Sequence, residues 1–525
     1  MPIQNRKKLS NTGNVVNSNI GKSYTNLKMK SSLLDNQEQI LSSSTPSSRK
    51  HVVIIGGSFA GLCAARHLSN NKEIDITVVE PRKVFEYVPG ACHLLAGSEA
   101  YHELITPIEE CLPNKVRHIT GLFLGLRPDK LRAVIKCIPD DENDNDITKD
   151  MLEALKSKNV VEIDYDAIIV CTGRGYATPI RASQEGRSFL GRINEIEKEK
   201  KRIEEAKTIL VVGGGLVGVE LAADIASRSK KFLSKQQEIF LISRSKLLNT
   251  LPQAAGTHAS NWFMRHNVSV SVSDEIIDTT DGVITTNKGI TCKPDIILDC
   301  TGRELTSSPK ELKNITFMTT NSFVSPYDDR GFLVVDDYLQ SSEYPHLQVF
   351  AAGDVIKHQH GVAFSYNASD FDSYGIKSNL PFVRNAHLAE SQAELVAYNV
   401  MTVLKNKTVD TMSKQLHRYP DDVFGNPLSP LLSCGSLGPR YSIVIFNDLV
   451  IGGVMLGLLG SFVKFLIERT KIAEIRNKVW GRAFWAFGHI VSNFIHGLMY
   501  HFNKLFKKTG YKPIPQKSTV LSVSP

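Results

Sequence analysis

The sequence has no C-x-x-C pair and no group of cysteines at zinc-site spacing, although its 525 residues include eight cysteines. A dithiol redox centre of the C-x-x-C type and a cysteine-based metal site are therefore excluded, and we expect no bound metal. Several of the cysteines lie inside apolar runs, which is typical of buried thiols. This pattern indicates a protein of a reducing compartment that is not built on disulfides.

A long apolar run is also absent. No stretch of about 18 or more strongly apolar residues occurs, so we expect no plain transmembrane helix. The net charge of +8 and the pI of about 8.9 are compatible with an anionic membrane surface or with nucleic acid. Most globular proteins with this charge bind neither, and we expect no nucleic-acid partner.

The first part of the chain is poor in acidic residues. Residues 1–50 contain none before Asp35 and are rich in Ser, Asn and Lys. This composition predicts either a disordered tail or an organelle-targeting presequence. The scarcity of arginine counts against the presequence, and both interpretations stay open.

The stretch VVIIGGSFAGL at 52–62 predicts a strand, a tight glycine turn and a helix. Two chemistries use this shape: the phosphate loop of a dinucleotide-binding unit, and a nucleophile elbow that presents Ser58 on a strained turn. The loop pattern G-x-G-x-x-G has serine at position 58 here, and the elbow pattern G-x-S-x-G has alanine at position 60. The stretch by itself therefore matches neither pattern fully.

A second stretch, TILVVGGGLVGVELAADIA at 208–226, contains a complete G-x-G-x-x-G between a predicted strand and a predicted helix. Gly213 forms the tight turn, Gly215 lets the backbone approach a pyrophosphate, and Gly218 lets helix and strand pack closely. The helix N-terminus adds free N–H groups and the positive end of a dipole. This stretch therefore predicts a dinucleotide site.

The sequence DITVVEPR, which follows the first stretch, bears on its two interpretations. It predicts a strand that ends in Glu80, where a carboxylate accepts hydrogen bonds from ribose hydroxyls. A hydrolase elbow needs no such carboxylate, so we interpret the first stretch as a phosphate loop, and a nucleophilic Ser58 stays a minor alternative. The predicted loop residues are Gly56, Gly57, Ser58, Phe59, Ala60 and Gly61.

Three further segments complete a pattern: YDAIIVCTGR at 165–174, its near-copy PDIILDCTGR at 294–303, and a later strand followed by Gly353-Asp354. In order and spacing, the five motifs resemble those of flavoproteins with two dinucleotide-binding domains, over about residues 51–405. The resemblance implies that the first loop binds FAD and the second the nicotinamide cofactor. It also implies that the Thr-Gly strands mark the crossings between domains and that Gly353-Asp354 reaches the ribityl chain of the flavin.

Within this superfamily the sequence resembles type II NADH dehydrogenases and the ferroptosis-suppressor branch of the apoptosis-inducing-factor family. FEYVPGACHLLAG at 85–97 resembles the segment that runs under the FAD, with His93 where that branch usually has an arginine. HLAESQAELVAYNVM at 387–401 resembles the helix that packs near the isoalloxazine. Sulfide–quinone reductases, which use separated cysteines near the flavin, are the alternative, with Cys92 or Cys171 as candidates.

Two residues bear on the nicotinamide cofactor. The resemblance implies that Glu220, expected on the first turn of the second helix, lies close to the nicotinamide. An acid that only favours the helix N-terminus is the alternative. The strand EIFLISRS ends in Ser243-Arg244 without an acid, and an arginine there can pair with the 2′-phosphate of NADPH. NADPH is therefore permitted, and a solvent-facing Arg244 is the other interpretation.

Residues 483–503 contain no Asp, Glu, Lys or Arg. Large apolar side chains recur there at helical spacing between basic flanks, which is typical of a helix lying in a membrane interface. A helix packed on the protein's own core or at a dimer interface is the alternative. The apolar positions are Phe484, Phe487, Val491, Phe494, Ile495, Leu498, Phe502 and Leu505, and the basic positions are Arg482, Lys504, Lys507 and Lys508.

The expected fold is α/β, with two Rossmann-like domains and a C-terminal region that contains an amphipathic membrane helix. The FAD-binding domain is expected at 51–206 and 301–430, the NAD(P)H-binding domain at 207–300 and the membrane-association region at 431–525. The remaining expected cofactor contacts are Glu80, His93, Leu122, Thr172, Gly173, Gly213, Gly215, Gly218, Glu220, Arg244, Gly302, Gly353 and Asp354.

The expected function is that of an FAD-dependent oxidoreductase that passes electrons from NADH or NADPH through the flavin to a quinone at an intracellular membrane surface. The mitochondrion is favoured, with the cytoplasmic face of another membrane as the alternative. The other functions that stay open are a sulfide–quinone reductase and a redox-sensing flavoprotein with little turnover, and a homodimer also stays open. The cofactor carries the chemistry in such an enzyme, so the sequence names no catalytic residue.

Overall fold

The structure is a computed structural model that describes the chain between residues 49 and 490, with gaps. The described residues are 49–98, 100–138, 159–174, 177–183, 185–232, 237–302, 326–328, 331–359, 385–405, 415–419, 432–446, 449–452, 454–488 and 490. The predicted N-terminal tail or presequence lies outside them, and so does the predicted membrane helix from Val491 onward.

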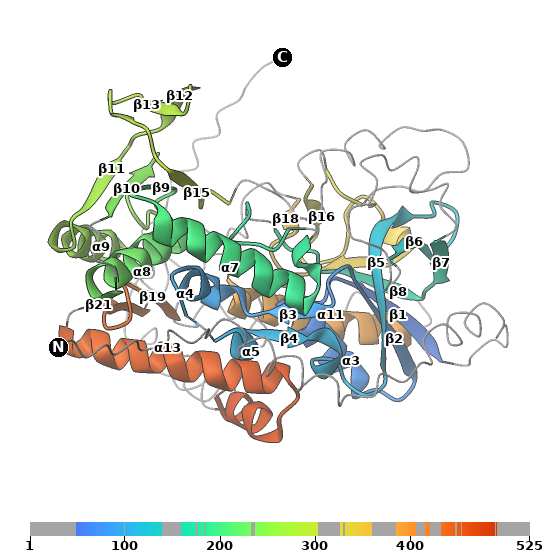
Figure 1. The fold of residues 1–525 in the computed structure, drawn as a ribbon. Helices are drawn as coiled ribbons and strands as arrows, with labels where there is room; N and C mark the ends of the chain where they lie inside the picture. The colour runs from blue at the N-terminus through green and yellow to red at the C-terminus, as the bar shows by residue number, and fades with distance from the viewer. Residues whose placement is uncertain are drawn as a thin grey trace, which may run out of the picture. The chain divides into compact units, whose positions relative to one another are not determined.

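Seven of the described strands form one sheet in the order β17-β8-β1-β2-β5-β6-β7 (Figure 1). The strands from β17 to β5 run parallel, and β6 and β7 are antiparallel to their neighbours. Their bounds are β1 (Lys50–Ile55), β2 (Ile74–Glu80), β5 (Val116–Leu126), β6 (Arg132–Cys137), β7 (Val160–Asp164), β8 (Ala167–Val170) and β17 (Val349–Ala351). The central strands are mostly apolar and buried, because a parallel sheet is covered on both faces.

Helices α3 (Phe59–Ser69) and α11 (Ala386–Lys405) pack against each other beside this sheet (Figure 1). The small residues of α3, in the sequence FAGLCAARHLS, allow the close approach. α11 includes the helix that the sequence predicts at 387–401. Both β17 and α11 come after the second glycine loop, so the chain returns to the first sheet after building the second.

The second sheet is parallel, in the order β11-β10-β9-β15. Its strands are β9 (Thr208–Val212), β10 (Glu238–Ser243), β11 (Val268–Val272) and β15 (Ile296–Asp299). Helix α8 (Leu216–Phe232) follows β9, and α9 (Gln253–Arg265) packs on β11. A small antiparallel sheet is formed by β12 (Ile276–Thr280), β13 (Val283–Thr286) and β14 (Thr291–Cys292). The predicted α/β fold is confirmed.

Two helices connect the regions around these sheets. The short α4 (Ala91–Leu95) lies beside both α7 (Phe189–Glu205) and α8 (Figure 1). Ser188 is the N-cap of α7, and its hydroxyl accepts a hydrogen bond from the Gly191 N–H at 3.1 Å. α7 leads directly into β9, so it joins the first sheet to the second.

The C-terminal region begins with an antiparallel sheet of β19 (Leu432–Ser436), β20 (Ser442–Phe446) and β21 (Leu449–Gly452). Helix α13 (Val454–Ile475) follows and packs on this sheet, and β19 in turn contacts α8. Residues 479–488 form a further helical segment. In the part of the chain that the structure describes, no helix is long and apolar enough to cross a membrane.

Candidate cofactor-binding and active site

The first glycine loop is a backbone turn that only glycine can complete. Gly56 has φ +108°, a conformation that side chains disfavour. A Cβ atom added to Gly61 would lie 1.8 Å from the carbonyl oxygen of Gly56, so α3 packs directly on the turn. Ser58 is the N-cap of α3 with an ordinary extended φ of −107°, not the strained turn of a nucleophile elbow. The geometry therefore favours the phosphate-loop interpretation.

The carboxylate of Glu80 lies behind this loop. Its Oε2 accepts the Gly57 N–H at 2.7 Å, and its Oε1 accepts the Arg82 Nε–H at 2.8 Å. Burial disfavours the charged form of Glu80, but the charge and hydrogen bonds of Arg82 and the N–H of Gly57 outweigh it and hold the pKa below its usual range. Glu80 therefore stays ionised and fixes the loop, as well as standing at the strand end where ribose is expected.

A second arginine, Arg181, lies close enough to Arg82 and Glu80 to interact with them electrostatically. Arg181 interacts electrostatically with Arg82 and Asp354, and its buried Nε has no hydrogen-bond partner among the described residues. Burial, together with the neighbouring Arg82 cation, lowers the pKa of Arg181. The acids Glu86, Asp354 and Glu80 also face Arg181, so its Nε, unpartnered among the described residues, is the feature that favours an anionic group here.

The other motifs of the first domain converge on the loop. A Cβ on Gly56 would lie 2.4 Å from the carbonyl oxygen of Cys171, which places the first Thr172-Gly173 pair against the turn. Gly173 has φ +69° and open space where its side chain would be. Gly353 donates its N–H to Gln392 at 2.8 Å, and a Cβ added to it would contact Ala60 of α3 at 3.4 Å.

The second glycine loop repeats this construction. Gly213 has φ +121°, and a Cβ on Gly218 would lie 2.0 Å from its carbonyl oxygen. Gly213 packs against Cys300, so the second Cys-Thr-Gly segment, with Gly302 at φ +63°, crosses behind the loop as the first one does. A Cβ on Gly215 would meet no atom within 4 Å, which leaves space for a phosphate to approach.

Glu220 is the fifth residue of α8, at the start of the second helical turn. The prediction of the first turn was wrong, because the helix already begins at Leu216, two residues before Gly218. The Glu220 Oε1 atom accepts hydrogen bonds from the N–H and the hydroxyl of Ser436, at 2.8 and 3.1 Å. It also forms an ion pair with Lys464 Nζ at 2.6 Å. The Glu220 charge raises the pKa of Lys464 despite the burial of that ammonium group. Glu220 therefore connects the second loop to β19 and α13.

His93 of α4 pairs with a carboxylate of α8. Its Nδ1 lies 2.7 Å from Oδ2 of the buried Asp224. Burial opposes the charged form of His93, but the neighbouring Asp224 carboxylate outweighs it and raises the pKa of His93 above its ordinary value. Burial raises the pKa of the Glu468 carboxyl group of α13, and the positive charge of His93 offsets only part of this rise. Helices α4, α8 and α13 thus meet in one polar cluster.

Two predicted contacts lie at the edges of these sites. Arg244 directly follows β10 and its side chain is exposed. Leu122 lies in β5 and packs in a small apolar cluster with Leu124 and Val134. The described contacts do not join Leu122 to either glycine loop, and both residues stay predictions as cofactor contacts.

A family model for pyridine nucleotide-disulphide oxidoreductases matches residues 50–386, which is more than half of the chain. The chain belongs to this family. It is therefore an oxidoreductase, and its cofactors are FAD and a nicotinamide nucleotide.

The relatives agree with this assignment. The oxidoreductase is similar to apoptosis-inducing factor homolog B of Dictyostelium discoideum, with 24% identity over 80% of this chain and 94% of the relative. It is also similar to external NADH-ubiquinone oxidoreductase 2, mitochondrial, of Saccharomyces cerevisiae, with 23% identity over 59% of this chain and 58% of the relative. A solved structure of NDH2 from Plasmodium falciparum in complex with NADH has the same fold, with a TM-score of 0.59 and 14% identity over 82% of this chain and 98% of that one.

The residues of this oxidoreductase fit FAD at the first loop. The N–H groups of Gly56 and Gly57 bond the Val79 carbonyl and Glu80, so the N–H groups left for a diphosphate are those of the first turn of α3, which begins at Phe59. Arg181 has a buried nitrogen available for an anion, and the space beside Gly173 is open. These observations support the first turn of α3 and Arg181 as the groups that would hold the cofactor's anionic part.

The cysteines of the oxidoreductase are all free, and five of the eight are buried. Burial raises the pKa of the thiols of both Cys92 and Cys171. A thiolate, not a thiol, is the reactive form of cysteine. These two residues therefore lack the activation that sulfur chemistry requires.

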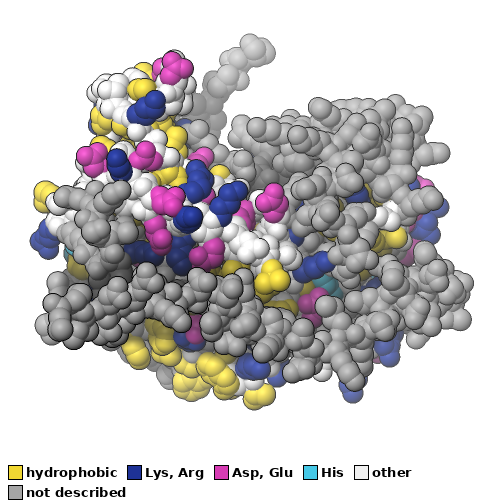
Figure 2. All heavy atoms as spheres, viewed as in Figure 1, with side chains coloured by type: hydrophobic (Ala, Val, Ile, Leu, Met, Phe, Trp, Pro, Cys, Tyr) yellow, Lys and Arg dark blue, Asp and Glu magenta, His cyan; other side chains and the backbone are white. Residues whose placement is uncertain are grey.

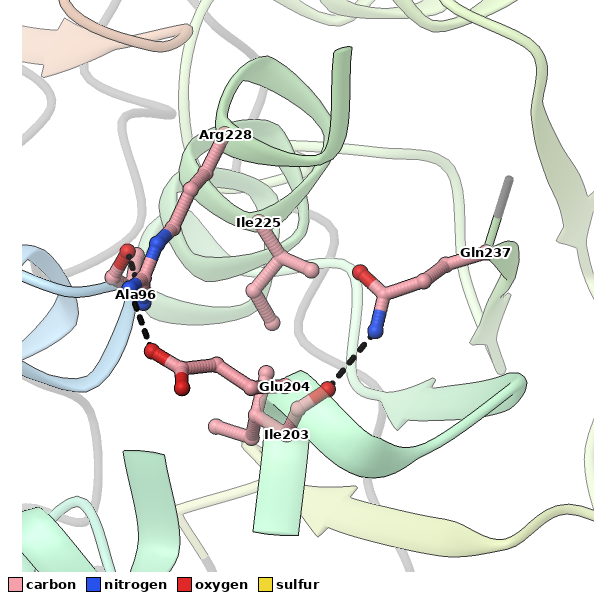
Figure 3. A pocket seen from close by; sticks show the side chains of 6 residues that line it. All are labelled: Ala96, Ile203, Glu204, Ile225, Arg228 and Gln237. Carbon is pink, nitrogen blue, oxygen red and sulfur yellow. Dashed lines mark hydrogen bonds and ion pairs between the residues drawn. The ribbon is translucent and has the colours of Figure 1, made fainter. Parts of the chain in front are cut away.

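A small cavity near α7 and α8 does not belong to the site (Figure 3). Arg228 on its wall pairs with Glu204 and donates a hydrogen bond to the Ala96 carbonyl at 3.0 Å, while Gln237 donates one to the Ile203 carbonyl at 2.7 Å. The cavity has room for about one water molecule. No residue of either glycine loop lines it, so it is a packing feature between the helices.

Sequence reasoning missed part of the site. Arg82 stands in the motif DITVVEPR two residues after Glu80, so its position near a buried carboxylate was a usable signal. Asp224, Ser436 and Lys464 gave no such signal, because they act through contacts between distant parts of the chain. Arg181 has no sequence pattern that marks it.

Proposed function

We propose that this flavoprotein is an NAD(P)H:quinone oxidoreductase that works at a membrane surface. In the proposal, FAD binds the domain formed by 51–206 and 301–430, the nicotinamide nucleotide binds 207–300, and the C-terminal region docks on the membrane. Bound FAD supplies the capacity to accept a hydride and to release its two electrons. The chain itself binds and orients the two cofactors and keeps the junction between them polar but buried.

One observation carries the proposal: α13 has two different faces. Lys464 points inward to Glu220 on the nucleotide-binding helix, with only 17% of its side chain exposed. Phe462, Phe465 and Leu466 of the same helix are 59%, 51% and 39% exposed. A single helix thus separates an apolar surface from the second glycine loop's helix, and in the proposal an apolar substrate approaches the site from the membrane side of this helix.

The apolar surface continues beyond α13. Val479, Trp480, Phe484, Phe487 and Ile490 are all exposed, two of them being predicted positions of the membrane helix. In Figure 2, hydrophobic side chains gather along the lower edge, where Figure 1 draws α13. Large exposed apolar patches of this kind mark interaction surfaces, and aromatic side chains suit a membrane interface.

The relatives support a quinone as the electron acceptor and a membrane as the location. One of them is named as an NADH-ubiquinone oxidoreductase of mitochondria, which favours a quinone as the acceptor and a mitochondrial membrane as the location. A sulfide–quinone reductase remains the alternative enzyme, but the buried, protonated thiols of Cys92 and Cys171 count against it. Bleaching of the flavin by sulfide would favour that alternative.

The membrane surface can be tested by removing its apolar side chains. The double variant Phe462→Ser and Phe487→Ser should bind liposomes at least about 10-fold more weakly, because each buried phenyl group contributes about 1.5–3 kcal/mol. Turnover of long-tailed quinones should fall with it, while NADH still reduces the flavin. The measurements are co-sedimentation with liposomes, steady-state turnover and stopped-flow flavin reduction.

The matched control is Ile277→Ser, since Ile277 is 62% exposed but lies in the small antiparallel sheet of the second domain. It should change neither liposome binding nor turnover. If the double variant binds liposomes and turns over long-tailed quinones like the wild type, the apolar surface is a packing or dimer surface instead.

A further inference from the structure

His93 is held at the boundary of three elements. It lies on α4 of the first domain, while its Nδ1 partner Asp224 lies on α8 of the second. Asp224 is almost fully buried, with 5% of its side chain exposed, but His93 retains 29% exposure. Within the described ranges, the second ring nitrogen of His93, Nε2, has no hydrogen-bond partner. A histidine oriented by a carboxylate at one nitrogen presents the other as a donor.

The charged groups that face His93 are Asp224 and Glu220 of α8 and Lys464 and Glu468 of α13. The acids outweigh burial and the Lys464 cation, so the pKa of His93 is raised. The imidazolium–carboxylate pair is therefore complete below about pH 6.5, the unfolded value, and is lost as pH rises through the higher folded pKa.

Glu220, Lys464 and Tyr87 are poorly suited to give up a proton near neutral pH, whereas Glu468, whose pKa burial raises, is the rival donor that the test below separates from His93. Glu220 is occupied by Ser436 and Lys464. The pKa of Lys464 is raised by Glu220, and burial raises that of the Tyr87 hydroxyl, so both hold their protons tightly. His93 is the described group here that combines a donor nitrogen, partial exposure and a nearby carboxylate to stabilise its charged form.

We propose that His93, positioned by Asp224, donates a proton to the quinone when it is reduced. The inference rests on the proposed function. Reduction to the quinol takes two electrons and two protons, and the hydride taken from the nicotinamide accounts for both electrons and one proton. The remaining proton leaves His93 Nε2 as the O–H bond of the quinol forms, and solvent then reprotonates the imidazole. His93 is the proton donor and Asp224 is a positioning residue.

The test separates the two half-reactions by stopped flow in the full-length holoenzyme. In His93→Gln, reoxidation of the reduced flavin by a short-chain quinone should slow about 100-fold, the usual contribution of a general acid. The wild-type decline of this rate with rising pH should vanish, while flavin reduction by NADH stays unchanged. His346→Gln, a change at an exposed histidine remote in sequence from the cluster, should match the wild type in both steps.

A second variant gives a readout that does not depend on turnover. Asp224→Asn should lower the pKa of His93, measured by histidine NMR titration, and should move the decline in reoxidation rate to lower pH by the same amount. A merely structural role for Asp224 would leave both values in place.

The contradicting results are distinct. If His93→Gln slows NADH reduction as much as reoxidation, or loses its flavin, His93 contacts the cofactor and the inference is wrong. If the pH-dependent decline persists in His93→Gln, another group, with Glu468 the first candidate, donates the proton. If NADH reduces the wild-type flavin but no quinone reoxidises it, the proposed function itself fails. This outcome is measured on the wild-type protein alone.

Discussion

The two glycine loops have the same backbone turn, but the residue at the end of the following strand differs between them. In both, the third glycine of the turn packs on the carbonyl of the first, with an added Cβ at 1.8 Å in one loop and 2.0 Å in the other. In both, a Cys-Thr-Gly segment crosses directly behind the turn. Such distances leave no room for a side chain, so the third glycine of each loop is required by helix–turn packing alone.

The loops differ at the end of the next strand. A Cβ on Gly57 would meet the side chain of Glu80, and a Cβ on Gly214 would meet that of Ser243, so these two strand-end residues are equivalent. Glu80 is a buried carboxylate paired with Arg82, whereas Ser243 is neutral and is followed by the exposed Arg244. Because the turn glycines are the same in both loops, the comparison leads us to expect that the strand-end residue beside each loop sets the ligand preference.

The largest expected effect comes from the packed glycines. Gly61→Ala should destabilise the first domain by about 1–3 kcal/mol, because the new methyl group clashes with a backbone carbonyl, and the purified protein should be colourless. Gly218→Ala should instead give yellow protein that NADH no longer reduces at the normal rate. Flavin content by absorbance and stopped-flow reduction are the measurements.

Gly488→Ala is the control, since its added methyl group meets no atom within 4 Å. It should keep full flavin content and a normal reduction rate. If Gly61→Ala stays yellow while Gly218→Ala loses its flavin, the two loops have been assigned to the wrong cofactors.

The loops were predictable because their signals are local. Glycine spacing, the preceding apolar strand and the strand end at Glu80 all lie within short stretches, and the structure has the strand and helix at each. The contacts around Glu220 were not predictable, because Ser436 and Lys464 lie 216 and 244 residues further along the chain. His93 could be singled out as a departure from the family's arginine, but its partner Asp224 belongs to a different domain.

A smaller effect is expected at the strand end of the second loop. Arg244→Glu should lower kcat/KM for NADPH about 10-fold or more relative to NADH, because a carboxylate repels the 2′-phosphate that the guanidinium can pair with. The measurement is steady-state kinetics with both nucleotides. An unchanged ratio would mean that Arg244 only faces solvent.

The central claim is that the first loop holds the flavin and the second delivers electrons to it from a nicotinamide nucleotide. The most direct measurement is the absorption spectrum of the purified wild-type protein under anaerobic conditions, before and after NADH or NADPH and then after a short-chain quinone. The account predicts a bound flavin whose absorption is bleached by the nucleotide and restored by the quinone. A protein without flavin, or a flavin that neither nucleotide reduces, would contradict it.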